Sequence, residues 1–130
     1  MENSQLIEKA RSVLQWKQLS PECTAAEVGA ALCTDKGNVY VGVSLSAACG
    51  TGYCGETAAI AQMITAGESR IDAIAALSGD GKLMPPCGRC RELLYQIDHG
   101  NLETRILLES GRSVRLLDLL PERWQALWEA

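Results

Sequence analysis

Apolar side chains at the start of the chain recur at helical spacing and then give way to two short apolar runs. Residues 4–18 predict a helix capped by Ser4 and ended by Ser20-Pro21, with an apolar face made of Leu6, Ile7, Ala10, Val13, Leu14 and Trp16. The runs 27–34 and 38–45 predict strands, because the turn sequence Asp35-Lys36-Gly37-Asn38 joins them. The beginning of the chain therefore predicts a helix followed by a β-hairpin.

The middle of the chain is dominated by apolar residues. Residues 56–66 are rich in alanine and apolar on most faces, which predicts a buried helix ended by Gly67. Residues 71–77 fit a helix or a strand, but their shortness and the Gly79-Asp80-Gly81 turn favour a buried strand. The middle segment therefore predicts one buried helix and one buried strand.

The last third of the chain predicts four further elements. A helix is expected from Cys87 to near Gly100, followed by strands over 105–109 and 113–117. Pro121 is expected to start a short final helix. The complete order predicts the α/β class, a three-layer α/β/α domain spanning residues 1–130 with a mixed sheet of five strands.

Two short motifs bring three thiols and a carboxylate into this framework. They are Cys54-Gly55-Glu56 and Pro86-Cys87-Gly88-Arg89-Cys90. Three thiolates can hold Zn²⁺ and leave its fourth tetrahedral position open, as a catalytic zinc requires. All three cysteines are expected at helix N-termini, where free N–H groups favour the thiolate. The chain is therefore expected to bind one Zn²⁺ through Cys54, Cys87 and Cys90.

Together these motifs resemble the cytidine deaminase superfamily, whose members pair a Cys- or His-x-Glu with Pro-Cys-x-x-Cys. Cys at the first ligand position is typical of the branch that acts on small nucleosides. The resemblance extends to Val28-Gly29-Ala30-Ala31-Leu32 and to the C-terminal Leu119–Trp124. It implies a cytidine-deaminase-like fold and the zinc-dependent hydrolysis of a cytosine nucleoside to its uracil form and ammonia. In this chemistry Glu56 takes a proton from the attacking water, passes it to the ring nitrogen and then protonates the departing amine.

The resemblance also implies which residues contact the substrate. The Gly55 N–H would bind the pyrimidine carbonyl, the Pro85 carbonyl would face the leaving amine, and Trp124 would stack on the base, often that of a neighbouring subunit. Ser44, Ser46 and Tyr53 are expected at the pocket mouth. Arg89 and Arg91 are the cations nearest the thiolates in sequence and are expected to offset their charge.

The chain departs from the cytidine deaminase pattern in two places that concern the substrate. Thr57 stands where these enzymes carry Arg, and Ser44-Leu45-Ser46 replaces the Asn-x-Glu that holds the ribose. Both departures favour the alternative of a blasticidin S deaminase-like enzyme acting on aminoacyl nucleosides. The absence of that family's Tyr-x-Trp ending favours cytidine deaminase.

Two alternatives from other functional classes remain open. Cys87 and Cys90 at a helix start are compatible with a thiol oxidoreductase, although this leaves Cys54 and Glu56 without a role. A non-catalytic zinc-binding domain would need a fourth protein ligand, which Cys49 could supply.

Composition and charge exclude several partners. The net charge of −4 and the scattered arginines argue against a nucleic-acid polymer as partner. No apolar run is long enough for a membrane span, and no secretory signal is evident. Six cysteines in such a chain are expected as reduced thiols, which indicates a cytoplasmic protein. The resemblance, together with the apolar C-terminus, predicts a homotetramer.

Overall fold

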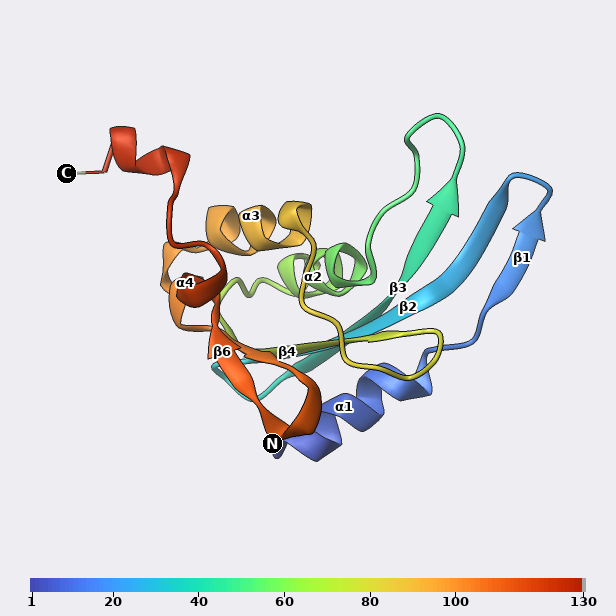
Figure 1. The fold of residues 1–130 in the computed structure, drawn as a ribbon, viewed down its shortest axis with the longest axis horizontal. Coiled ribbons are helices and arrows are strands. Elements are labelled where there is room, and N and C mark those ends of the chain that lie inside the picture. The colour runs from blue at the N-terminus through green and yellow to red at the C-terminus, as the bar shows by residue number, and fades with distance from the viewer. Residues whose placement is uncertain (130) are drawn as a thin grey trace.

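A mixed sheet with helices on both faces forms the body of the protein (Figure 1). The computed structural model describes residues 1–129. The strands are β1 (Lys17–Ser20), β2 (Cys23–Thr34), β3 (Val39–Ala47), β4 (Ile71–Ser78), β5 (Arg105–Leu107) and β6 (Ser113–Arg115). The helices are α1 (Asn3–Ser12), α2 (Gly55–Thr65), α3 (Gly88–Ile97) and α4 (Leu116–Leu119), with 3₁₀ turns at His99–Glu103, Glu109–Gly111 and Trp124–Leu127.

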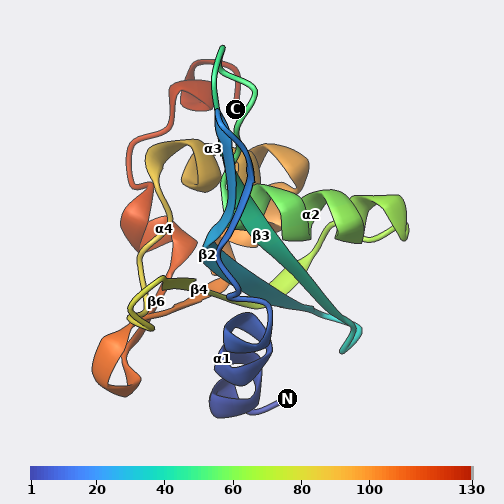
Figure 2. The same cartoon turned by 90° about the vertical axis from the view of Figure 1, so that its right-hand side faces the viewer.

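The long strand β2 organises the sheet because three other strands pair with it. β3 pairs antiparallel with β2, whereas β1 and β4 pair with its early and late residues. β4 then pairs in parallel with β5, and β5 antiparallel with β6. α1 covers one face of this sheet, and α2 and α3 lie side by side over the other (Figure 2). The α/β/α prediction is confirmed, although the sheet has six strands rather than five.

The additional strand is β1, which overlaps the end of the predicted helix 4–18 and continues to Ser20. α1 ends at Ser12, and Lys17–Ser20 pair instead with the start of β2 around the turn at Pro21. The predicted cap was also wrong, since Glu2 rather than Ser4 is the N-cap and exchanges bonds with Gln5. Trp16 fits the helical spacing, but its side chain is exposed.

The C-terminal elements are shorter than the sequence predicts. The predicted strand 113–117 ends at Arg115, because Asp118 accepts the Arg115 N–H at 3.0 Å and starts the short helix α4. The final helix expected from Pro121 is a 3₁₀ turn over Trp124–Leu127. The predicted hairpin turn at residues 35–38, the helix ended by Gly67 and the strand after it are confirmed.

Very small residues let α2 lie directly on β3. A Cβ on Gly42 would lie 2.6 Å from the Cβ of Ala58 and closer still to the backbone of Ala59. Ala59, Ile60 and Met63 of α2 are buried against this side of the sheet. The helix therefore cannot shift away from the strand without losing this contact, and its N-terminus is held at one place above the sheet.

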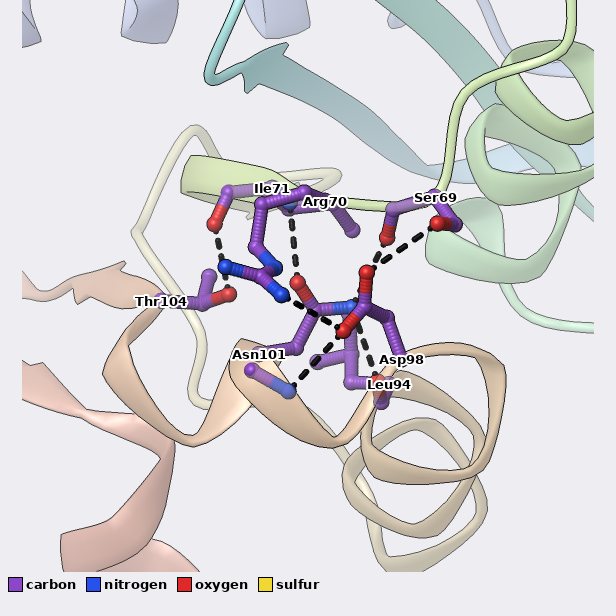
Figure 3. Close-up of polar contacts among 8 residues, drawn as sticks. Ser69, Arg70, Ile71, Leu94, Asp98, Asn101 and Thr104 are labelled. Atoms are coloured by element: carbon purple, nitrogen blue, oxygen red, sulfur yellow. Dashed lines mark hydrogen bonds and ion pairs between the residues drawn. The ribbon is translucent and has the colours of Figure 1, made fainter.

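A buried amide ties the end of α3 to the start of β4 (Figure 3). The side chain of Asn101 is fully buried, and its Oδ1 accepts the Ile71 N–H at 2.9 Å. Its Nδ2 donates to the carbonyls of Ser69 and Leu94 at 3.0 and 2.9 Å. This one side chain thus satisfies three backbone groups that packing removes from water.

Replacing Asn101 by Leu should lower the free energy of unfolding by about 3 kcal/mol, because the side chain keeps its size but three backbone groups lose their partner. Urea unfolding followed by circular dichroism would measure the loss. Asn3→Leu, at an exposed position in α1, is the control and should change stability by less than about 0.5 kcal/mol. Equal effects of the two substitutions would show that the Asn101 bonds contribute nothing.

Candidate metal centre and active site

Three thiols from two helices meet at one point. Cys54 is the N-cap of α2, Cys87 is the N-cap of α3, and Cys90 lies in the first turn of α3. The Sγ atoms of Cys54 and Cys87 are 3.4 Å apart, and those of Cys87 and Cys90 are 3.6 Å apart. A tetrahedral zinc with Zn–S bonds of about 2.3 Å places its sulfurs about 3.8 Å from one another. The cluster therefore fits one Zn²⁺ per chain, as the sequence predicts.

The geometry also shows whether a fourth protein side chain is close enough to complete the metal site. Within residues 1–129, Cys54, Cys87 and Cys90 are the group of Cys, His, Asp or Glu side chains close enough together to share an ion. Cys49 lies in the preceding loop, is exposed and does not join this group. Three protein ligands with one position left over are the arrangement of a catalytic rather than a structural zinc.

The thiols of the cluster have unequal acidity. Burial raises the pKa of the Cys90 thiol far above its ordinary value, and the Glu56 carboxylate adds to the effect. Burial, together with the Cys87 thiol, also raises the pKa of Cys54. The pKa of Cys87 is lowered, because the N–H groups of Cys90 and Arg89 and the neighbouring thiols outweigh the effect of burial. Because a metal binds the thiolate form, uptake of a divalent ion must release protons from Cys54 and Cys90.

Glu56 lies beside this cluster in the first turn of α2. Its side chain is only 6% exposed and forms part of a cavity wall. Burial raises the pKa of this carboxyl above its ordinary value, opposed by its own backbone N–H and by the Cys90 thiol. A raised pKa makes a carboxyl a better proton acceptor and brings its titration closer to the pH of the reaction, which favours general acid–base catalysis.

A cavity of about 460 Å³ opens over Cys54, Glu56 and Cys87. It lies at the junction of β2, β3, the N-terminus of α2 and the loop that precedes α3. Most residues expected to contact the substrate line it, namely Ser44, Ser46, Tyr53, Gly55 and Pro85, and Arg89, expected to offset the thiolate charge, also borders it. The size suits a small-molecule ligand.

The loop before α2 pairs with β3 and so forms one side of the cavity. Tyr53 and Leu45 exchange two backbone hydrogen bonds, each of 2.9 Å. Gly52 allows this approach, because a Cβ there would collide with the carbonyl of Leu45 and lie 3.1 Å from the Ala47 nitrogen. Cys54 therefore enters α2 from a fixed turn.

The two arginines near the cluster take different places. Arg91 donates from Nε to the Pro86 carbonyl at 2.8 Å and from Nη1 to the Leu119 carbonyl at 3.2 Å. Its guanidinium thus links the loop before Cys87 to α4. Arg89 is exposed and borders the cavity. Of the two, Arg89 is the cation placed to meet a ligand.

Trp124 does not line the cavity of its own chain. Its Nε1 donates to Glu92 on α3 at 3.0 Å, and its side chain is 52% exposed. The ring meets Trp128 edge to face, with centroids 4.7 Å apart. Together with Leu127, these rings leave large apolar side chains exposed near the end of the described chain.

The cavity also contains residues that the sequence pattern did not single out as site residues. Glu27, Val28 and Met84 belong to its lining. Val28 is part of a motif typical of the first hairpin, but nothing in its spacing indicates that it borders the site. Met84 directly precedes Pro85, so its place follows from that of its neighbour.

Comparison with known proteins agrees with this geometry. Residues 1–104 match the family described as the cytidine and deoxycytidylate deaminase zinc-binding region. The cytidine deaminase of Mycobacterium tuberculosis is 36% identical over 96 residues, which cover 73% of this chain and 70% of that protein. The chain therefore belongs to the zinc-dependent cytidine and deoxycytidylate deaminase family.

Solved structures show the same fold. The crystal structure of the Mycobacterium tuberculosis cytidine deaminase superposes with a TM-score of 0.79 at 31% identity, covering 95% of this chain and 98% of the other. The cytidine deaminase of Burkholderia pseudomallei superposes with a TM-score of 0.76 at 28% identity, covering 95% and 100%. The cytidine-deaminase-like fold predicted from the motifs is confirmed.

The thiol cluster makes a direct prediction about metal content. Purified protein should contain one zinc ion per chain by mass spectrometry of the metal, and Cys87→Ser should lose most of it because a neutral hydroxyl replaces a thiolate. Cys49→Ser is the matched control and should keep the full content. Loss of zinc from Cys49→Ser would mean that Cys49 closes the site, which would contradict an open fourth position.

Proposed function

We propose that this protein catalyses the hydrolytic deamination of a free cytosine nucleoside, cytidine, deoxycytidine or a close analogue, with release of ammonia. The observation that carries the proposal is the placement of Glu56, buried in the cavity wall beside three thiols that leave a metal position open. Family membership and the similarity to cytidine deaminases support the same reaction. A thiol oxidoreductase would leave this carboxyl unused.

We assign roles to the chain's own groups from the family resemblance, supported by the place of Glu56 beside the three thiols. Cys54, Cys87 and Cys90 would hold a zinc ion, which would supply Lewis-acid activation of the attacking water. Glu56 takes the proton of the attacking water and transfers it to the ring nitrogen beside the reacting carbon. The carboxylate then takes the remaining proton of the added hydroxyl and passes it to the amine, so that the C–N bond breaks, the carbonyl forms and ammonia departs.

Backbone groups around the cavity would hold the base. The N–H of Gly55 lies at the start of α2, where it has no partner within the helix, and is assigned to the pyrimidine carbonyl. The carbonyl of Pro85 is assigned to the amine. Ser46, Tyr53 and Arg89 also line the cavity and are proposed to meet the sugar.

A second candidate substrate is an aminoacyl nucleoside such as blasticidin S. The small side chains of Ser44, Ser46 and Ala47 line the part of the cavity formed by β3, which leaves room for a substituted sugar. The Ser44 hydroxyl is moreover engaged by the Val28 N–H at 2.9 Å. The reaction at the cytosine ring would be the same for both substrates.

Ammonia release from zinc-loaded protein tests the proposal and separates the two substrates. Cytidine, deoxycytidine, cytosine and blasticidin S would be offered in parallel. Glu56→Gln should lower kcat by at least about a hundredfold, because the amide cannot carry the proton. Glu8→Gln on the outer face of α1 is the control and should be as active as the unmodified protein.

Turnover of the plain nucleosides would establish a cytidine deaminase, and turnover of blasticidin S alone would establish the second candidate. No ammonia from any substrate, with zinc bound in full, would contradict the proposed function and favour a non-catalytic zinc domain.

We further propose a cytoplasmic homotetramer whose deaminase domain spans residues 1–130. Six free thiols support a reducing compartment. Large exposed apolar side chains support assembly, above all Leu127 at 85% and Trp128 at 72% exposed. No helix among residues 1–129 is long and apolar enough to cross a membrane. In the assembly Trp124 would reach the cavity of a neighbouring subunit and stack on the base.

Light scattering at micromolar concentration tests the assembly. A particle of about four times the 14.0 kDa chain mass is expected. Leu127→Lys should reduce the mass, because it places a charge in the apolar contact, whereas Glu8→Gln should leave it unchanged. A single species of one chain mass for the unmodified protein would contradict the tetramer.

A further inference from the structure

An irregularity in the sheet lies directly beneath the start of the catalytic helix. The β2–β3 ladder pairs Ala25 with Leu45 and then Gly29 with Val43. Between these pairs, the β2 residues 26–28 face Ser44 alone on β3. The extra residues form a β-bulge, in which Ala26 adopts a positive φ of 66°.

The bulge deprives the Val28 N–H of a ladder partner, and a side chain replaces it. The Ser44 Oγ accepts this N–H at 2.9 Å. The other edge of β2 is regular at this point, since Val28 is in register with Ser78 of β4. Val28 is therefore held from both sides, on one side by the sheet and on the other by a single hydroxyl.

The first residue of α2 rests on Val28. A Cβ on Gly55 would lie 3.1 Å from the Val28 carbonyl oxygen and 3.4 Å from its Cγ1. Gly55 stands between the metal ligand Cys54 and the buried Glu56. The position of the Val28 carbonyl above the sheet therefore determines how far this end of α2 extends into the cavity.

From these contacts we propose that Ser44 is a positioning residue for Glu56. Its hydroxyl fixes Val28 at the bulge, Val28 supports Gly55, and Gly55 sets the place of the Glu56 carboxyl relative to the substrate. The proposal rests on the deaminase function above. It gives Ser44 a role in orientation rather than in direct contact with the sugar, and it explains why a short hydroxyl side chain suits this position.

Kinetics of Ser44 variants would separate the two roles. Ser44→Ala removes the acceptor and should lower kcat about tenfold with KM changed less than about twofold, because misplacing a reacting group affects the chemical step. Ser44→Thr keeps the hydroxyl and should retain kcat within about twofold. An unchanged kcat with a raised KM in Ser44→Ala, or no rescue by Thr, would overturn the proposal.

Gly55→Ala provides a second and independent test. The added methyl group would press on the Val28 carbonyl and should lower kcat about fivefold while Ser44 holds Val28 in place. In the Ser44→Ala background Val28 can yield, so the same substitution should cost less than about twofold. Additive effects of the two substitutions would overturn the proposal, because they would show that the residues act separately.

Hydrogen exchange tests the contact without any activity measurement. Exchange of the Val28 amide should become at least about tenfold faster in zinc-loaded Ser44→Ala and stay unchanged in Ser46→Ala, which removes a hydroxyl from the same strand. Unchanged exchange in Ser44→Ala would overturn the proposal. If the unmodified protein releases no ammonia from any cytosine nucleoside, the proposed function fails, while accelerated exchange would still show that Ser44 holds Val28.

Discussion

The close contact between α2 and β3 is the constraint on which the site depends. Because Gly42 has no side chain, the backbone of α2 lies against the strand at Ala58 and Ala59 and cannot tilt or slide freely. The N-terminus of this helix therefore holds two functional side chains at a fixed position relative to the sheet. They are Cys54 at the N-cap and Glu56 in the first turn. Any larger side chain at position 42 would lift the helix and move both groups together.

The other half of the site is anchored independently. α3 is tied to β4 through the buried Asn101, and the loop before it is tied to α4 through Arg91. Two helices fixed by different contacts thus bring their N-termini to one point. The thiols arrive within the spacing that a zinc ion requires, so little rearrangement is needed for the ion to bind.

Local spacing explains why the thiol cluster and the position of Glu56 beside it could be predicted from the sequence, whereas other features of the structure could not. Cys54 and Glu56 share one helix start, and Cys87 and Cys90 share another, so their spacing carries the information. β1 was missed because Trp16 continues a helical spacing, while the pairing that makes 17–20 a strand involves residues on β2. The bulge at Ala26 could not be predicted either, since it depends on how two strands align and on a hydroxyl from β3.

The pairing of β2 with β4 has a consequence for how the molecule folds. These strands meet at Val28 and Ser78, with β3 and the whole of α2 between them in the chain. Loop closure over such separations is slow compared with the formation of a helix or a hairpin. α2 can therefore form early, but Cys54 meets Cys87 only after this long-range step. We expect zinc capture to be a late event on the folding pathway. Before Cys54 and Cys87 meet, other thiols such as Cys23 and Cys49 are expected to compete for the ion.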